Sequence, residues 1–200
     1  MAKTWKDSDI NLDPIKDQTI AIIGYGIQGD AQANNLKDSG LKVIIGLKEG
    51  GSSWNKANND GHEVMSVSEA CKKADIIHVL IPDMVQSKVY KDEIEPNISE
   101  GNALAFSHAA AIYWGWIKAP DNVDVIMVAP KGPGSKVRET YLDGFGTPSI
   151  VAVEQDKTGT AWDRTLGIAK GIGSARAGLI KTTFKEEVET DWFGEQADLC

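Results

Sequence analysis

Residues 18–35, QTIAIIGYGIQGDAQANN, determine how the rest of the chain is organised. An apolar run at 20–23 leads into three glycines, Gly24, Gly26 and Gly29, and a polar stretch that permits a helix follows. In this order of strand, glycine turn and helix, the first glycine allows a tight turn, the second leaves room for phosphate beside the backbone, and the third lets the helix lie close to the strand. The sequence therefore predicts a dinucleotide site whose pyrophosphate faces the N–H groups at the start of the helix. The alternative is an ordinary turn between a strand and a helix.

The composition is that of an ordinary globular protein. The 200 residues are 42% hydrophobic and 25% charged, which is enough for one sizeable core and a small second module. With 29 acidic and 21 basic side chains the net charge is −8, so we expect neither nucleic acid nor an anionic membrane as a partner. No apolar stretch approaches the roughly 18 residues of a membrane span, and the N-terminus has no apolar signal core. Cys71 and Cys200 are not spaced like metal ligands and are too few for a disulfide framework. This fits a reducing compartment, so we expect a cytoplasmic protein.

Strand-like and helix-like segments alternate along the chain. This alternation predicts a doubly wound, Rossmann-type α/β fold with a parallel sheet covered on both faces. We expect Ser52 or Ser53 to cap the helix that follows the second strand. After the first strand and its helix at about 28–39, the expected segments are strand 41–46, helix 53–59, a short strand near Val64, helix 69–73, strand 74–82, helix 83–92, and strands 102–108, 123–130 and 148–153.

The loop after the second strand bears on the choice of cofactor. An NAD-type site places a carboxylate at the end of that strand to accept from the ribose 2′-OH, but this position is Gly46. The loop offers instead a cation and two hydroxyls, from Lys48, Ser52 and Ser53, which suit a 2′-phosphate. Glu49 is the opposing observation, because its carboxylate would favour NAD if it turned inward; flanking glycines favour an outward, solvated side chain. We therefore predict NADP rather than NAD.

Two residues at predicted strand ends are candidate catalytic groups. His108 ends the strand 102–108, and Lys131 lies between VAP and GPG, on a loop held by proline and glycine. Ligands of doubly wound sheets bind beyond the carboxyl ends of the strands, so both side chains are expected in one crevice. The alternatives are a structural histidine and a solvated loop lysine. His62, in a turn, and His78, inside an apolar strand, are poorer candidates, and His78 is expected to be a hydrogen-bonded core imidazole.

The last twenty residues are acidic and have helical spacing. Asp191 and Glu195 are four residues apart, which puts both carboxylates on one face of a helix. Like charges so placed are unfavourable unless a cation lies between them. Mg²⁺, which is usually bound by one or two carboxylates together with water, is the expected cation. The alternative is a solvated acidic face. The neighbouring Trp192 and Phe193 indicate that this stretch is packed.

Five stretches of the chain match a known family: GYGIQGDAQANNL at 24–36, GLKEGGSSW at 46–54, IPDMVQ at 81–86, APKGPG at 129–134 and FKEEVETDWFGEQADLC at 184–200. In this order they resemble the ketol-acid reductoisomerase (acetohydroxy-acid isomeroreductase) family over essentially the whole chain. The resemblance implies an oxidoreductase of branched-chain amino-acid (valine, isoleucine, leucine) biosynthesis. Such an enzyme rearranges 2-acetolactate or 2-aceto-2-hydroxybutyrate by Mg²⁺-dependent alkyl migration and reduces the product with NADPH.

The resemblance also implies roles for particular residues. His108 is the catalytic histidine, Lys131 is an active-site lysine, and Asp191 and Glu195 are ligands in a site for two Mg²⁺ ions in the complete enzyme. With the turn glycines and Ser52, the predicted cofactor site is made of Gly24, Tyr25, Gly26, Ile27, Gln28, Gly29, Lys48, Gly51, Ser52, Ser53, Asp83, Met84, Val85, Gln86 and Gly134.

Two features depart from the family pattern. The family pattern has a glycine, an aromatic residue and an asparagine after His108, but this chain has alanines at 109–111, so neither the family's loop shape nor its polar contribution carries over to these residues. We expect an NADP-binding domain at 1–182 and the first helix of an all-helical catalytic domain at 183–200, with the rest of that knotted domain and its further metal ligands beyond residue 200. The complete enzyme is expected to be a homo-oligomer, whereas these 200 residues are expected to bind cofactor without turnover.

Two rival functions remain open from the residues alone. A metal-independent NADP-dependent hydroxy-acid dehydrogenase would use His108 or Lys131 without Mg²⁺. A non-catalytic nucleotide-binding module would bind NADPH with no response to Mg²⁺.

Overall fold

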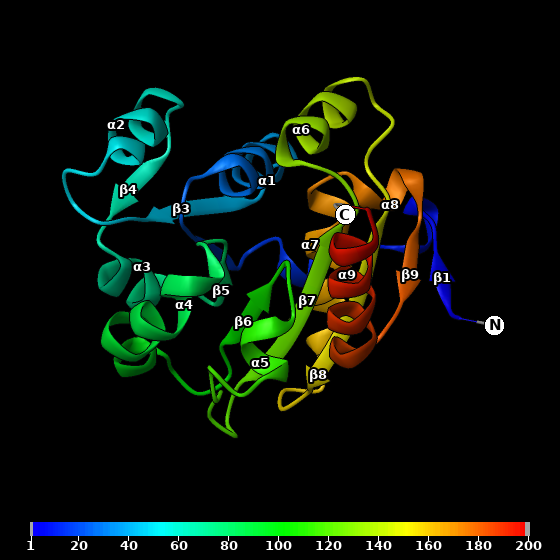
Figure 1. The fold of residues 1–200 in the computed structure, drawn as a ribbon. Coiled ribbons are helices and arrows are strands. Elements are labelled where there is room, and N and C mark those ends of the chain that lie inside the picture. The colour runs from blue at the N-terminus through cyan, green and yellow to red at the C-terminus, as the bar shows by residue number, and fades with distance from the viewer. Residues whose placement is uncertain (1, 199–200) are drawn as a thin grey trace.

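A computed structural model describes residues 2–198 of the chain, with side chains described as far as residue 194. The described residues form one nine-stranded sheet with helices on both faces (Figure 1). The strands are β1 (Thr4–Trp5), β2 (Thr19–Ile23), β3 (Lys42–Gly46), β4 (Glu63–Met65), β5 (Ile76–Val79), β6 (Ala103–Phe106), β7 (Asp124–Pro130), β8 (Ser149–Gln155) and β9 (Leu179–Lys181).

Helices connect most of these strands. α4 continues directly into a π-helical turn, Tyr90–Ile94, and three short 3₁₀ segments occupy Asp7–Asp9, Asp13–Ile15 and Glu95–Asn97. The α-helices are α1 (Ile27–Asp38), α2 (Ser52–Asn59), α3 (Val67–Lys73), α4 (Asp83–Val89), α5 (Ala110–Tyr113), α6 (Gly134–Leu142), α7 (Ala161–Gly171), α8 (Ser174–Ala177) and α9 (Phe184–Asp198).

The centre of the sheet has the predicted doubly wound arrangement. Its strands lie in the order β4-β3-β2-β5-β6-β7, and every neighbouring pair among them is parallel. The strand order therefore reverses between β2 and β5, and in such sheets the ligand binds at the carboxyl ends of the strands beside this reversal. The predicted fold class is confirmed, and the glycine turn after β2 lies at the point of reversal.

The parallel arrangement predicted from the sequence does not extend to the other edge of the sheet. β8 pairs antiparallel with β7, and β9 pairs parallel with β8. β1 is the outermost strand and pairs antiparallel with β9. The Lys131 N–H donates to the carbonyl oxygen of Pro148, so the chain re-enters the sheet beside the point where β7 leaves it. The intervening helix α6 packs on α1 and does not cross the face of the sheet, and β8 must therefore run in the opposite direction.

The two faces of the central strands bury separate apolar cores. In β2, Ile20 and Ile22 pack toward the layer of α1, α7 and α8, whereas Ala21 and Ile23 pack toward α3, α5 and α9. This alternation follows from the two-residue period of a strand, and it explains why strands covered on both faces are apolar at every position. Figure 1 shows α9 lying beside β7 and β8, which brings the acidic C-terminal segment onto the sheet.

Two local expectations differ from the structure. The N-cap of α2 is Gly51, and neither serine caps this helix: Ser52 is its first residue, and no side chain accepts a hydrogen bond at the cap. No element was expected between 154 and 183, but α7, α8 and β9 lie there. Among residues 2–198, no helix combines the length and the apolar character that crossing a bilayer requires.

Candidate functional site

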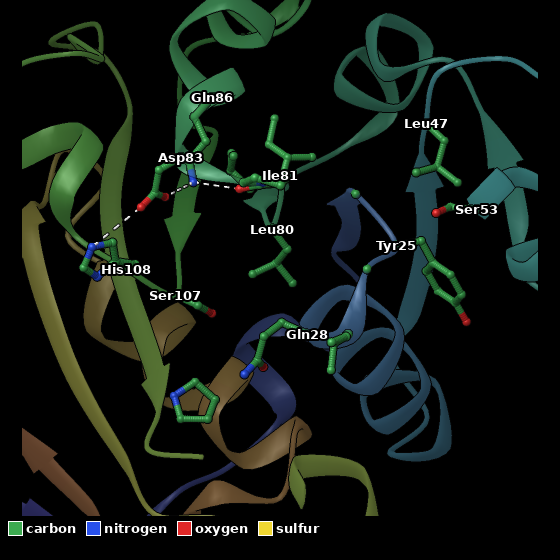
Figure 2. A pocket seen from close by; sticks show the side chains of 16 residues that line it. Tyr25, Gln28, Leu47, Ser53, Leu80, Ile81, Asp83, Gln86, Ser107 and His108 are labelled. Carbon is green, nitrogen blue, oxygen red and sulfur yellow. Dashed lines mark hydrogen bonds and ion pairs between the residues drawn. The ribbon is translucent and has the colours of Figure 1, made fainter. Parts of the chain in front are cut away.

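A pocket of about 610 Å³ opens at the point where the strand order reverses. Its volume lies within the range usual for sites that hold a small molecule or a cofactor. Figure 2 shows Tyr25 and Ser53 on one side of the pocket and His108 on the other. The lining also includes Gly24, Gly26, Ile27, Gln28, Leu47, Val79, Leu80, Ile81, Pro82, Asp83, Gln86, Ser107 and Pro130.

The glycine turn borders this pocket as the sequence predicts. Gly26 is the N-cap residue of α1, and a Cβ built on it would meet nothing within 4 Å. The turn therefore leaves open space where phosphate is expected to approach the backbone. Gly29 does not line the pocket; a Cβ there would overlap the carbonyl group of Gly24, which indicates its close packing of helix against strand. Gly134 packs in the same way against the backbone of Ile27, so it also acts behind the pocket surface.

The loop after β3 contributes to one side of the pocket. Ser53 lines it, whereas Lys48, Gly51 and Ser52 are not among the lining residues. Lys48, Glu49 and Ser52 are exposed to solvent. The pocket edge at this loop thus presents a hydroxyl and contains no carboxylate, which is compatible with a 2′-phosphate.

The start of α4 forms the opposite wall. The Gln86 amide is buried, and its Nε2 donates to the carbonyl oxygen of Ile81 at 2.9 Å and to Asp83 Oδ1 at 2.8 Å (Figure 2). These bonds fix the turn that follows β5. Met84 and Val85 are exposed at 95% and 44% of their surfaces and do not line the pocket.

Four charged side chains from three segments of the chain meet beside the pocket. His108 Nδ1 donates to Glu187 Oε1 at 3.1 Å, and the Asp191 carboxylate lies 3.7 Å from the same nitrogen. Lys131 Nζ lies 3.5 Å from Asp191 and 3.7 Å from Glu187. On the pocket side, His108 Nε2 lies 3.8 Å from Asp83 (Figure 2). The structure therefore brings together both predicted catalytic residues and one predicted metal ligand, Asp191.

Glu187 is a member of this cluster that the sequence analysis missed. Its side chain is 1% exposed, and its second oxygen accepts the backbone N–H of Ala109 at 3.0 Å. Glu187 lies four residues before Asp191, so the same helical spacing that paired Asp191 with Glu195 also points to Glu187. The side chain of Glu195 lies outside the described residues.

The alanines after His108 leave a backbone donor at the site. Ala109 is buried, and its N–H binds Glu187, while the next residues form α5. The apolar side chains of 109–111 pack in the core, so this loop adds no polar side chain to the cluster. The chain after His108 thus forms a short helix that is held to Glu187.

The pKa values of the histidine and the buried carboxylate move in opposite directions. The hydrogen bond from His108 to Glu187 raises the pKa of His108 more than partial burial lowers it. Burial would raise the pKa of Glu187, but the hydrogen bonds from His108 and Ala109 and the nearby positive charges outweigh it and lower that pKa. Both shifts favour the charged forms, so the pair is held as imidazolium and carboxylate over a widened pH range.

One side of the cluster is fit to hold a divalent cation. His108, Glu187 and Asp191 each offer a ligand atom, all within 4.8 Å of one another. Glu187 is already engaged by His108 and Ala109, whereas no hydrogen bond to a described residue occupies the carboxylate of Asp191. Asp191 is therefore the described group best suited to Mg²⁺.

The two other histidines lie away from this cluster. His78 is fully buried, and its Nε2 contacts Ser107 Oγ at 3.3 Å, but its Nδ1 has no described partner. The expected core imidazole is thus only half hydrogen-bonded. His62 Nε2 contacts the Asn34 side chain at 3.2 Å, behind Tyr25.

The doubly wound sheet, the glycine turn and the pocket at the strand reversal define a Rossmann-type nucleotide-binding domain with a charged cluster at one end of its pocket. Residues 14–178 match the family described as "Acetohydroxy acid isomeroreductase, NADPH-binding domain", and the chain belongs to this family.

Relatives with the same family name match the chain from end to end. The chain is 83% identical over 200 residues to a protein named ketol-acid reductoisomerase (NADP(+)) from Nitrosopumilus maritimus, covering 60% of that protein, and 58% identical over 200 residues to one from Methanocaldococcus jannaschii, covering 61%. A solved structure of an "NADH-preferring ketol-acid reductoisomerase from an uncultured archean" superposes with a TM-score of 0.95 at 45% identity, over 99% of this chain and 61% of that one. The chain thus spans about three fifths of the length of these relatives.

Proposed function

We propose that this chain binds NADPH and carries the histidine and lysine of a ketol-acid reductoisomerase. The complete enzyme would convert 2-acetolactate or 2-aceto-2-hydroxybutyrate to a 2,3-dihydroxy acid in branched-chain amino-acid biosynthesis. The observation that carries this proposal is that one pocket runs from the glycine turn and Ser53 to His108, beside which Lys131 and Asp191 meet.

The NADPH part of the proposal rests on the space left by the turn. Gly26 leaves the backbone open to phosphate, and Ser53 is positioned to bind a 2′-phosphate with its hydroxyl. The reduced nicotinamide would supply a hydride when bound. Ser53 and His108 line opposite sides of the pocket, which supports assigning the reduction to the histidine end.

The catalytic part rests on three side chains with different tasks. His108, oriented by Glu187, can exchange a proton with a substrate oxygen. Lys131 can donate a hydrogen bond to an oxygen that gains negative charge during alkyl migration. Mg²⁺, held by Asp191 and in the predicted scheme by Glu195, would supply Lewis-acid polarisation of the substrate oxygens.

The remaining parts of the enzyme are assigned to the rest of the protein. We assign residues 1–182 to the cofactor domain and 183–200 to the first helix of the helical catalytic domain, whose further carboxylates would complete a site for two Mg²⁺ ions. A homo-oligomer of the complete protein belongs to the same proposal. The relatives, which are longer than this chain, support this division.

The test compares binding with turnover. The 200-residue chain is titrated with NADPH, followed by nicotinamide fluorescence, and then mixed with NADPH, Mg²⁺ and 2-acetolactate while absorbance is recorded. We expect binding without turnover, because Asp191 lacks the enclosing ligands of the complete enzyme. Turnover at roughly 1 per second or faster, a usual enzymatic rate, would show that the rest of the protein is dispensable. Metal-independent reduction of a simple 2-keto acid would instead support a hydroxy-acid dehydrogenase.

A further inference from the structure

A buried amide on α1 connects two side chains that line the cofactor pocket. Gln32 is fully buried, and its Nε2 donates to Gln28 Oε1 at 3.1 Å and to Ser107 Oγ at 3.1 Å. Gln28 and Ser107 both line the pocket (Figure 2), whereas Gln32 lies behind them. Both N–H groups of one carboxamide are therefore committed to pocket residues from two different segments.

The bonds around Gln32 fix the direction of every neighbouring group. Gln28 Nε2 donates to the carbonyl oxygen of Gly132 at 3.0 Å, so Gln28 Oε1 is the atom that accepts from Gln32. Ser107 gives its single hydroxyl proton to the Val128 carbonyl oxygen at 2.9 Å, which leaves its oxygen to accept from Gln32. The same oxygen can accept from His78, which then carries its proton on Nε2.

This chain of bonds joins the glycine turn to the catalytic segments. Gln28 lies in the first turn of α1, Gly132 follows Lys131, and Ser107 precedes His108. Ser107 faces α1 while His108 faces α9, as expected for consecutive residues at a strand end. A change in the orientation of Gln28 or Ser107 would therefore alter the pocket surface and the loops that hold the cluster.

The fold alone does not require an amide at this position. Gln32 Oε1 is buried and has no described hydrogen-bond partner. A buried polar atom without a partner lowers stability, and an apolar side chain of similar length would avoid that loss. The amide is thus suboptimal for packing but suited to holding two acceptors in place.

We propose that Gln32 is a positioning residue for the cofactor: its carboxamide holds the Gln28 side chain and the Ser107 hydroxyl in the orientations that face bound NADPH. This inference rests on the proposed NADPH binding of the chain. Gln32 acts through Gln28 and Ser107, and without it the Gln28 amide is held only by its bond to Gly132.

Asn35 provides a matched control on the same helix. It is also a fully buried amide, and its Nδ2 donates to the carbonyl oxygens of Val137 and Ile172, away from the pocket. Gln32→Met and Asn35→Leu each remove the donors of one buried amide and keep a side chain of similar size. We expect Asn35→Leu to unfold at lower urea concentration than the unmodified chain, whereas Gln32→Met should change less, because it also removes the unpartnered Oε1. Only Gln32→Met should weaken NADPH, by about tenfold, which corresponds to about 1.4 kcal/mol.

A double-mutant cycle separates positioning from general loss of stability. Gln28→Ala should weaken NADPH by a similar factor. Gln32→Met should add a smaller loss in the Gln28→Ala background than in the unmodified chain, because only the part of its effect that passes through Ser107 remains. NADPH affinity is measured by fluorescence titration on each folded variant. Gln28→Ala also tests the proposal if Gln32→Met fails to fold, since Gln28 is only partly buried.

The outcomes distinguish this inference from the proposed function. Failure of the unmodified chain to bind NADPH contradicts the proposed function. Binding by the unmodified chain together with unchanged affinity in Gln32→Met, or in Gln28→Ala, overturns the role of Gln32. Equal weakening of NADPH by Asn35→Leu and Gln32→Met also overturns it, because the effect would then be a general consequence of losing a buried amide.

Discussion

The Glu187 carboxylate accepts a hydrogen bond from the His108 imidazole, with 3.1 Å between Glu187 Oε1 and His108 Nδ1. The same carboxylate accepts the Ala109 N–H, so one buried side chain from α9 fixes both the ring and the backbone of the strand end. Glu187→Gln should lower the free energy of unfolding by about 2 kcal/mol. Hydrogen bonds to a charged acceptor are stronger than those to a neutral one, and the amide nitrogen of Gln cannot accept one of the two hydrogen bonds that the carboxylate accepts. Urea unfolding followed by circular dichroism measures this loss.

Glu189→Gln is the matched control, because Glu189 lies on the same helix with 54% of its side chain exposed. It should change the free energy of unfolding by less than about 0.5 kcal/mol. A loss in Glu189→Gln equal to that in Glu187→Gln would mean that helix charge, and not the bonds to His108, is responsible.

The same pair predicts a pH window. The pKa of Glu187 is lowered by folding, so its contribution is complete above its unfolded value of about 4.5 and is lost as pH falls through the folded value. The pKa of His108 is raised, so its contribution is complete below about 6.5 and is lost as pH rises through its folded value. The stability difference between the unmodified chain and Glu187→Gln should therefore be largest between about pH 4.5 and pH 6.5. A difference that is constant from pH 4 to pH 8 would contradict this assignment.

Sequence patterns located much of this site but not its geometry. The glycine turn and the strand-end residues His108 and Lys131 could be predicted because parallel strands end at one edge of the sheet. Glu187 was missed, because its burial depends on α9 docking against α5, a contact between segments far apart in the sequence. Spacing alone does not distinguish a buried acid from a solvated one on an acidic helix.

The fold shows the same division between local and distant information. The alternation of strands and helices from β2 to β7 follows from apolar runs separated by helical segments, and the doubly wound class was predicted from it, but the order of the strands within the sheet was not. The direction of β8 was not, because it depends on α6 packing on α1 and on the Lys131 to Pro148 hydrogen bond. The capping prediction failed at Ser52 because a glycine with suitable backbone angles precedes it.

The second prediction concerns cofactor choice. The chain should bind NADPH more tightly than NADH, and Ser53→Asp should reverse this order by placing a carboxylate against the 2′-phosphate. Isothermal titration with both cofactors should show a loss of NADPH affinity of at least about tenfold. Ser52→Asp is the control, because Ser52 is exposed and does not line the pocket, so its effect should be smaller. Equal affinities for the two cofactors in the unmodified chain would contradict the prediction.

The third prediction uses the buried imidazole of His78. Burial lowers its pKa to about 3, so between about pH 6.5 and pH 3 the unfolded chain binds a proton that the folded chain does not. Stability should fall as pH decreases through this range. In His78→Leu the loss between pH 7.5 and pH 5 should be smaller by about 2 kcal/mol, because full linkage of one proton is worth about 1.4 kcal/mol per pH unit. His62 is present in both chains and cancels in the comparison; identical pH profiles would show that His78 is protonated in the fold.

The fourth prediction separates binding from folding at the glycine turn. Gly26 has φ −79° and ψ −159°, which other residues adopt, and an added Cβ meets no atom within 4 Å. Gly26→Ala should therefore fold with unchanged stability, or gain up to about 1 kcal/mol from a less flexible unfolded chain. The new methyl group would occupy pocket space that phosphate needs, so NADPH affinity should fall by at least about tenfold.

Gly29→Ala supplies the opposite control in the same turn. A Cβ at Gly29 would overlap the Gly24 carbonyl group, 3.0 Å from its carbon, and this overlap is with backbone, not with the end of a flexible side chain. The free energy of unfolding of this variant, measured in urea, should therefore fall. The two variants should thus differ in the two measurements: Gly26→Ala loses NADPH affinity and keeps its stability, whereas Gly29→Ala loses stability. Retention of full NADPH affinity by Gly26→Ala would show that the pyrophosphate does not pass over this turn.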